Sequence, residues 1–225
     1  MNFKGIIFDL DGTIADTGGD LSNAINLMLE SFGFAKNSQS DILKHINFGA
    51  RAFVSGNLPE KVKTSPDFKD FFDEAFGRYI KFYEEHCLEK TYLYDGIAGL
   101  VKSLRENKIK MCVLSNKPDD LTKKVVGGLL NADDFAGIIG GSERFPHKPE
   151  PDSALYLAKK MNAESHEILF VGDSDVDMKT AINAKMFPLG ATWGYRPESV
   201  LIESGAKKTV NNPGEILDFI LNFKQ

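Results

Sequence analysis

The sequence contains very little cysteine, which excludes several classes of protein at once. Only 2 of its 225 residues are cysteines. Cys112 lies inside the apolar run MCVLS, and Cys87 ends a stretch with helical periodicity. Neither has the spacing of a metal site, a redox motif or a disulfide framework. The 4 histidines are scattered along the chain, without the close pairs that zinc sites use. We therefore expect a protein of the reducing cytoplasm.

Long apolar runs and an excess of basic residues are missing as well. No run approaches the ~18 apolar residues of a membrane-spanning helix. A first strand expected from about Gly5 leaves no room for a secretory signal peptide. The 27 Lys and Arg residues are outnumbered by 32 Asp and Glu, for a net charge of -5. We expect no binding to nucleic acids or membranes. A phosphorylated ligand is not excluded, because local charge in a site can oppose the net charge.

From residue 92 onward, short apolar runs alternate with amphipathic stretches. The runs cover residues 110–115, 136–140, 168–173, 187–192 and 208–210, and GIIF at 5–8 has the same character. The amphipathic stretches cover residues 97–106, 119–130, 151–161, 176–184, 197–204 and 214–223. Continuous apolar runs are typical of parallel strands that are buried on both faces. Their alternation with helices predicts an α/β fold, a doubly wound, Rossmann-like core with a parallel sheet.

Between the first strand and the rest of this core lies a segment without strand patterns. Residues 20–87 show helical periodicity, most clearly in an aromatic stripe from Phe68 to Tyr83 at spacings of three and four. We interpret this stripe as packing rather than as a cofactor site. The predicted domains are an α/β core of residues 1–14 and 91–225 and an inserted α-helical cap of residues 15–90. An insert directly after a strand that ends in carboxylates is typical of a lid over a site.

Polar side chains gather where the predicted strands end, and in open α/β sheets ligands bind beyond these ends. The candidates are Asp9, Asp11, Gly12 and Thr13 after the first strand, Ser115 and Asn116 at the strand of 110–115, Lys148 in FPHKPEPD, and Asp173 and Asp177 at the strand of 168–173. Asp9, Asp11 and Asp173 would repel one another if they converged without a cation. A set of ligands made only of oxygen atoms favours Mg²⁺ over zinc.

The same residues suit a phosphate ester as the second ligand of that metal. Mg²⁺ commonly shares its coordination shell with a substrate phosphate. Ser115 and Asn116 can donate hydrogen bonds to phosphate oxygens, and Lys148 can neutralise their charge. A carboxylate nucleophile next to a second carboxylate that acts as acid and base would split hydrolysis through an aspartyl-phosphate. The pattern therefore predicts a Mg²⁺-dependent enzyme that acts on a small phosphorylated metabolite.

Simpler interpretations exist for individual residues. Ser115 could cap the helix that follows it, a role compatible with catalysis, and Lys148 alone would be an ordinary exposed lysine. The run from Asp173 to Asp177 imitates the start of an EF-hand calcium loop. That loop needs glycine and glutamate where this chain has Met178 and Ala184. We exclude calcium sensing on this ground.

Four motifs in chain order, DLDGT, LSN, HKPEPD and GDSDVD, resemble those of the haloacid dehalogenase superfamily of phosphohydrolases. The helical insert after the first motif resembles the cap of that superfamily. The resemblance implies that Asp9 is the nucleophile and Asp11 the general acid and base. It further implies that Mg²⁺ is held by the Asp9 carboxylate, by Asp11 through its backbone carbonyl, and by Asp173.

The resemblance also assigns the residues around the phosphoryl group. Ser115 and Lys148 would hold the transferring phosphoryl group. Asp177 would orient the lysine and the groups that bind the metal. The phosphate-binding set is completed by Gly12, Thr13 and Asn116.

Two further segments, NFGARAFV at 47–54 and GATWGYR at 190–196, resemble phosphoglycolate phosphatases and their relatives. The first segment would place Arg51 near a substrate carboxylate. Dehalogenases of the superfamily lack the second aspartate of the first motif, which is Asp11 here. Phosphoglucomutases usually carry valine where this chain has Thr13. Both features favour hydrolysis of a phosphoester.

Phosphoglycolate is therefore the leading expected substrate, with a sugar phosphate, a nucleotide or pyrophosphate as alternatives. A different class of function is a regulatory or partner-binding module that retains the site. The presence of Asp9, Asp11, Lys148 and Asp173 together argues against that class, because binding alone needs no nucleophile beside an acid and base. The sequence is compatible with a monomer or a homodimer.

Overall fold

The computed structural model describes residues 3–223 and contains two compact units. The core unit consists of the chain up to Asp16 together with the chain from Leu93, and the helical unit is Thr17–Tyr92. The chain leaves the core unit through the short strand β2 (Ala15–Asp16) and returns through β3 (Tyr92–Leu93).

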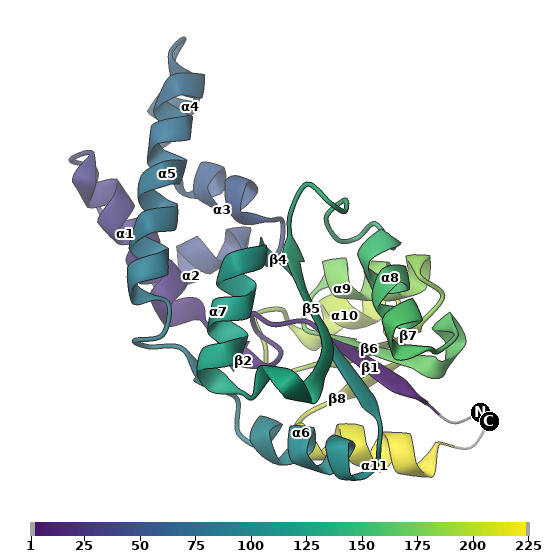
Figure 1. Ribbon diagram of the computed structural model, residues 1–225. Helices are drawn as coiled ribbons and strands as arrows, with labels where there is room; N and C mark the ends of the chain where they lie inside the picture. Colours follow the sequence, from purple (N-terminus) through teal and green to yellow (C-terminus); the bar gives the residue numbers. More distant parts are fainter. Residues whose placement is uncertain (1–2, 224–225) are drawn as a thin grey trace. The chain divides into compact units, whose positions relative to one another are not determined.

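A six-stranded sheet forms the centre of the core unit (Figure 1), in the order β5-β4-β1-β6-β7-β8. Its strands are β1 (Gly5–Phe8), β4 (Lys110–Pro118), β5 (Phe135–Gly141), β6 (Ile168–Gly172), β7 (Phe187–Ala191) and β8 (Lys208–Val210). All neighbouring strands are parallel. The side chains of β1 and β6 are buried throughout, as expected for strands covered on both faces. The predicted doubly wound α/β core is confirmed.

One strand is longer than its apolar run indicated. β4 continues to Pro118 instead of ending at residue 115, with an irregularity after Leu114. The strand resumes because Pro118 pairs again with β5, at Gly141. This extension places Ser115, Asn116 and Lys117 within β4 rather than in a loop.

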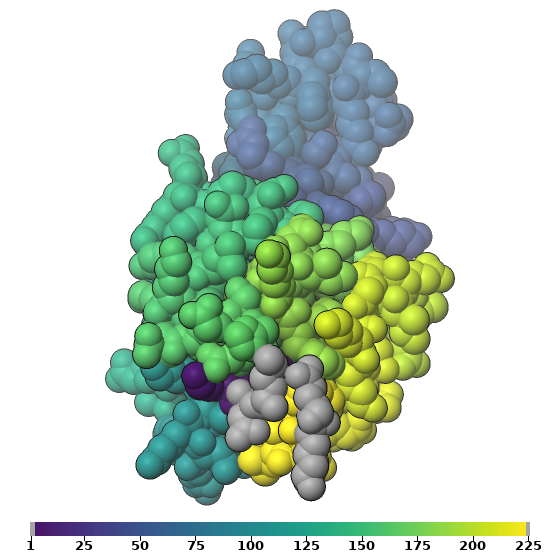
Figure 2. Space-filling model, turned by 90° about the vertical axis from the view of Figure 1, so that its right-hand side faces the viewer, coloured from purple at the N-terminus to yellow at the C-terminus, as the bar shows by residue number. Residues whose placement is uncertain are grey.

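Helices flank the sheet. They are α6 (Ile97–Glu106), α7 (Asp119–Leu129), α8 (Asp152–Met161), α9 (Asp175–Asn183), α10 (Glu198–Glu203) and α11 (Gly214–Asn222), with 3₁₀ turns η2 (Ala132–Asp134) and η3 (Ser165–Glu167). α8 and α9 share one apolar core with Ile7, Cys112 and Phe170 of the sheet. α6 and α11 pack together away from them. Figure 2 shows that the green and yellow segments of the second half of the chain form one face of this unit.

The helical unit is built around two long helices. Its elements are α1 (Gly18–Ser31), α2 (Gln39–Ile42), the 3₁₀ turn η1 (Leu43–His45), α3 (Ala50–Asn57), α4 (Glu60–Lys63) and α5 (Phe68–His86). α1 packs along α5, and the buried side of α5 includes Phe72, Tyr79 and Tyr83. The Tyr79 ring contacts that of Phe53 on α3, with centroids 5.9 Å apart. The aromatic stripe is therefore used for packing, as expected.

A buried carboxylate joins the two ends of the helical unit. Asp20, in the first turn of α1, is 0% exposed. It accepts hydrogen bonds from the backbone N–H groups of Lys90, at 3.0 Å, and Thr91, at 2.9 Å. None of the helices described has the length and apolarity that crossing a membrane requires.

Candidate active site

Three neighbouring strands bring residues from separate motifs to one edge of the sheet. β4, β1 and β6 lie side by side and run in the same direction, so their carboxyl ends meet. Asp9 follows β1, Ser115 lies in the last part of β4, and Asp173 follows β6. Lys148 reaches the same place from the segment before α8.

A cluster of three aspartates lies at the centre of this edge. Asp9, Asp173 and Asp177 each offer a carboxylate oxygen, and these oxygens lie within 4.8 Å of one another. The three residues are 2%, 0% and 0% exposed, respectively. Three buried carboxyl groups at this spacing can be ionised together only with a cation between or beside them.

Lys148 supplies part of that positive charge. Its Nζ lies 2.6 Å from Asp9 Oδ1 and 2.6 Å from Asp177 Oδ1. The lysine side chain is only 4% exposed. One ammonium group therefore links the residue expected to be the nucleophile with the aspartate expected to support it.

Burial and mutual repulsion change the ionisation of this cluster. Burial raises the pKa of Asp9 well above its ordinary value, and the charge of Asp177 adds to this while Lys148 opposes it. Burial and Asp177 also raise the pKa of Asp173 to about 7, against the opposing effect of the Tyr195 N–H. Burial alone would lower the pKa of Lys148, but Asp177 and Asp9 together raise it above its usual value. These carboxyl groups would ionise more readily with an additional cation nearby.

The Asp173 carboxylate is held by the first motif and by the loop after β7. Its Oδ1 accepts a hydrogen bond from Thr13 Oγ1 at 3.2 Å, and its Oδ2 accepts one from the Tyr195 N–H at 2.7 Å. Gly12 has φ +91°, and a Cβ there would lie 2.3 Å from Asp173 Oδ2. Only glycine combines this left-handed conformation with so close an approach.

Asp177 is fixed by the start of α9. Ser174 is the N-cap of this helix, and its hydroxyl donates to Asp177 Oδ2 at 2.5 Å while accepting from the Asp177 N–H. The Ser174 N–H also donates to Asp177 Oδ2, at 3.1 Å. This capping box orients the carboxylate so that Oδ1 faces Lys148. Asp175, by contrast, forms an ion pair with Lys179 on the surface of the helix.

Ser115 and Asn116 differ in how their side chains are used. Ser115 Oγ accepts a hydrogen bond from the Lys117 N–H at 3.2 Å, which leaves the hydroxyl hydrogen to donate to another acceptor. The Asn116 side chain donates to the Lys148 carbonyl at 3.0 Å and accepts from the Lys148 N–H at 2.9 Å. Asn116 thus contacts the backbone of Lys148, which its sequence context did not indicate.

Asp11 lies outside the cluster of three and has a cation of its own. Its Oδ1 is 2.9 Å from Lys117 Nζ, and the two side chains are 9% and 4% exposed. The sequence interpretation gave Lys117 no role. Its position directly after LSN, at the end of a predicted strand, was the available signal, but lysine at such a position is usually solvated.

Two other contacts were also missed. The Tyr195 N–H and the Ser174 hydroxyl hold the two aspartates of the GDSDVD motif. A backbone donor leaves no signature in the side-chain sequence. Ser174 follows directly after Asp173, and serine three residues before an aspartate is a recognisable capping signal.

Arg51 belongs to the helical unit. Its Nη2 lies 2.7 Å from Asp73 Oδ1, and its guanidinium lies over the rings of Phe72 and Phe76, 4.7 and 4.9 Å from their centroids. Contact with a substrate carboxylate stays a prediction for this residue.

The residues present fit a divalent metal ion. Four buried carboxylates, Asp9, Asp11, Asp173 and Asp177, face two buried ammonium groups, Lys117 and Lys148. With all of these groups ionised, the site carries two uncompensated negative charges. Asp9 Oδ2 is also buried and has no hydrogen-bond partner. A buried carboxylate oxygen without a donor is the kind of atom that binds a metal or attacks an electrophile.

Comparison with known proteins gives a consistent result. A model of the haloacid dehalogenase-like hydrolase family matches residues 6–191. Phosphoglycolate phosphatase 1 of Pseudomonas aeruginosa is 29% identical over 213 residues, which are 94% of this chain and 78% of that protein. Phosphoglycolate phosphatase of Aquifex aeolicus is 31% identical over 190 residues, 84% of this chain and 85% of that protein.

Solved structures share the fold along the whole chain. A crystal structure from Lactobacillus delbrueckii subsp. bulgaricus, of a protein provisionally assigned as a phosphoglycolate phosphatase, matches with a TM-score of 0.87 and 28% identity. The match covers 99% of this chain and 100% of that chain.

Proposed function

Because the chain belongs to the haloacid dehalogenase-like hydrolases, we propose that it is a phosphatase that hydrolyses the monoester of a small metabolite through Asp9. One observation carries the proposal. Asp9 Oδ1 is held by Lys148 at 2.6 Å, whereas Asp9 Oδ2 is buried without a hydrogen-bond partner. A carboxylate fixed on one side and unsolvated on the other is prepared to act as a nucleophile.

The proposed reaction has two steps. Asp9 Oδ2 attacks phosphorus, the bond from phosphorus to the ester oxygen breaks, and Asp11 donates its proton to the departing oxygen. Asp11 then takes a proton from water, the water oxygen attacks phosphorus, and the bond to Asp9 breaks with release of phosphate. Lys148 and the Ser115 hydroxyl would hold the oxygens of the transferring group.

The metal proposed for this site is Mg²⁺. Asp9, Asp173 and the Asp11 backbone carbonyl would hold it, with Asp177 supporting Asp9 through Lys148. When bound, the ion would neutralise charge between the carboxylates and the phosphoryl group. All of the donor atoms in this set are oxygens, as Mg²⁺ requires.

The proposed substrate is phosphoglycolate. The relatives from Pseudomonas aeruginosa and Aquifex aeolicus are named for that activity, which supports the proposal. We further propose that residues 15–90 act as a cap that selects the substrate, with Arg51 as a contact for its carboxylate. A sugar phosphate, a nucleotide and pyrophosphate are the alternative substrates.

The test is phosphate release from a panel of phosphoesters, with Mg²⁺, with a chelator and with the Asp9→Asn variant. We expect metal-dependent release that the variant abolishes, with phosphoglycolate preferred. Release that the folded variant retains would overturn the role of Asp9. Failure of the folded wild-type protein to release phosphate from any ester would favour the partner-binding alternative.

A further inference from the structure

We propose that Lys117 is a positioning residue that holds Asp11 in place for its two proton transfers. The inference rests on the proposed phosphatase function and assigns a role to a residue outside the recognised motifs. It starts from the distance of 2.9 Å between Lys117 Nζ and Asp11 Oδ1. Both side chains are almost fully buried, with 4% and 9% exposure.

Lys117 is anchored at both ends. Its N–H donates to Ser115 Oγ at 3.2 Å, and its carbonyl accepts from Thr122 Oγ1 at 3.0 Å. The backbone at the end of β4 is thereby tied to α7 while the ammonium group reaches the neighbouring first motif. The Lys117 side chain is only 4% exposed, and burial removes most of the rotamer freedom of a lysine.

The two buried lysines divide the carboxylates between them. Lys148 pairs with Asp9 and Asp177, whereas Lys117 pairs with Asp11. Removal of Lys117 would take the ammonium group away from a carboxylate that is 9% exposed, and loss of one partner of a buried ion pair is strongly unfavourable. The carboxylate would then turn away from the position from which it can reach the ester oxygen.

The consequence is specific to substrates that need an acid. An alkyl phosphate expels an alkoxide, which must be protonated as it leaves, whereas 4-nitrophenyl phosphate expels a stable phenolate. General acid catalysis contributes about 10²–10⁴-fold when it is needed. Loss of Lys117 should therefore slow phosphorylation of Asp9 by an alkyl phosphate far more than by the nitrophenyl ester.

The experiment measures the rate of phosphoenzyme formation by rapid quench for both esters with the Lys117→Met variant, which keeps the apolar stem. We expect the alkyl ester to lose roughly tenfold or more relative to the nitrophenyl ester. Lys117→Arg, which retains the charge, should also slow the alkyl ester more than the nitrophenyl ester, but by a smaller factor. This variant provides the test if Lys117→Met does not fold. Lys4→Met, which removes an exposed pair with Glu167, should change neither rate.

A double-mutant cycle separates this role from a merely structural one. In the Asp11→Asn background, Lys117→Met should add less than about a twofold effect, because its target is already gone. Equal losses for both esters, or additive effects in the cycle, would overturn the proposal. An inactive wild-type protein would instead refute the proposed function, so the two failures are distinguishable.

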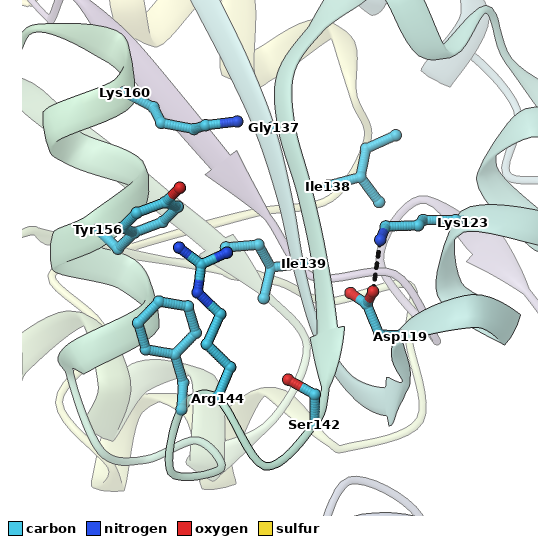
Figure 3. Close-up of a pocket in the computed structure, with 10 residues that line it drawn as sticks. Asp119, Lys123, Gly137, Ile138, Ile139, Ser142, Arg144, Tyr156 and Lys160 are labelled. Carbon is cyan, nitrogen blue, oxygen red and sulfur yellow. Dashed lines mark hydrogen bonds and ion pairs between the residues drawn. The ribbon is translucent and has the colours of Figure 1, made fainter.

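A second inference comes from a cavity that is independent of these residues. A hollow of about 240 Å³ lies beside the edge strand β5, lined from α7, α8 and the segment after β5. In Figure 3, Arg144, Tyr156 and Lys160 lie on one side of β5, and the pair Asp119–Lys123 lies on the other. From the first group, we infer a binding site for a small anion that carries a phosphate group.

Arg144 is the principal group of this site. Its guanidinium lies 4.9 Å from the ring centroid of Phe145 and 4.5 Å from that of Tyr156, so stacking fixes its orientation. Within residues 3–223, neither Arg144 nor Lys160 forms an ion pair. A planar guanidinium that forms no ion pair, in a hollow that the Lys160 side chain also lines, matches the geometry and charge of phosphate.

The probe is inorganic phosphate, titrated at constant ionic strength and followed by amide chemical shifts. We expect saturable shifts at Gly137, Ile139 and Ser142, in addition to shifts at Gly12 from the catalytic site. Arg144→Gln should abolish the first set and leave the second, whereas Arg105→Gln, which removes an exposed pair with Asp134, should change neither. Absence of saturation at β5, or saturation that Arg144→Gln leaves unchanged, would overturn this inference.

Discussion

The Asn116 side chain and the Lys148 backbone form a reciprocal pair of hydrogen bonds. Asn116 donates to the Lys148 carbonyl at 3.0 Å and accepts from the Lys148 N–H at 2.9 Å. This pair fixes the main chain of the residue whose ammonium group contacts Asp9. The second and third motifs are therefore coupled through one amide side chain.

Asn116→Ala should lower kcat by about 10–100-fold, the usual effect of removing a group that orients a reacting residue. The loss should arise because Lys148 is no longer held beside Asp9. Asn183→Ala is the matched control, since Asn183 also donates to the same segment, at Pro149, but is exposed. Steady-state kinetics measure both variants. Equal kcat values for Asn116→Ala and the wild type would contradict the coupling.

Gly12→Ala should weaken binding of Mg²⁺ by about tenfold or more. The added Cβ would lie 2.3 Å from Asp173 Oδ2, so the carboxylate must move from the position in which Thr13 and Tyr195 hold it. Isothermal titration with Mg²⁺ measures the effect.

Gly33→Ala provides the control for backbone strain. Gly33 also has a positive φ, +72°, but a Cβ there would meet nothing within 4 Å. Both variants should lose about 1–2 kcal/mol of stability from the left-handed conformation, whereas only Gly12→Ala should lose metal affinity. Parallel losses of affinity would show that the effect is not local to Asp173.

Much of the site was predictable because parallel strands that lie side by side bring the residues of separate motifs close together. Asp9, Ser115 and Asp173 each lie at the end of an apolar run, and parallel strands place such ends on one edge of the sheet. The same reasoning predicted the α/β core, since its strands are continuous apolar runs that need cover on both faces.

The contacts that were not predictable depend on three-dimensional detail. Lys117 reaches Asp11 only because β4 continues to Pro118 and lies beside β1. The Tyr195 N–H reaches Asp173 through the conformation of the loop after β7. The amino-acid types alone do not predict that a strand continues past its apolar run. They also do not predict the direction in which a single backbone N–H points.

Asp20→Ala should destabilise the protein by about 3 kcal/mol, since the N–H groups of Lys90 and Thr91 lose a buried charged acceptor. In a chain of this size, that corresponds to a fall in Tm of roughly 6–12 °C. Thermal unfolding followed by circular dichroism measures it. Glu30→Ala, which removes an exposed pair with Lys36 in the same unit, should change stability by less than about 0.5 kcal/mol. Similar Tm values for the two variants would contradict a structural role for Asp20.

The raised pKa of Asp173 predicts that the metal-free protein loses stability as pH increases. Its folded-state pKa of about 7 lies above the ordinary value of 3.8. Below the ordinary value, both the folded and the unfolded chain keep the proton. Between the two values the unfolded chain releases it and the folded chain does not, so ionisation favours unfolding progressively until about pH 7. Above the folded-state pKa of about 7, the stability that the retained proton of Asp173 gave the folded chain is fully lost.

Asp173→Asn isolates this effect from the other carboxyl groups, because its side chain has no proton to release. We expect metal-free wild-type protein and the variant to have similar Tm values near pH 4. The variant should become the more stable of the two as pH rises to 7, and the difference should then level off. Saturating Mg²⁺ should reverse the order above pH 7, because the ion binds the ionised carboxylate that the variant lacks. A difference in Tm that does not change between pH 4 and 7 would mean that Asp173 ionises as readily in the folded chain as in the unfolded one. The aspartate cluster would then not need the charge of a metal ion.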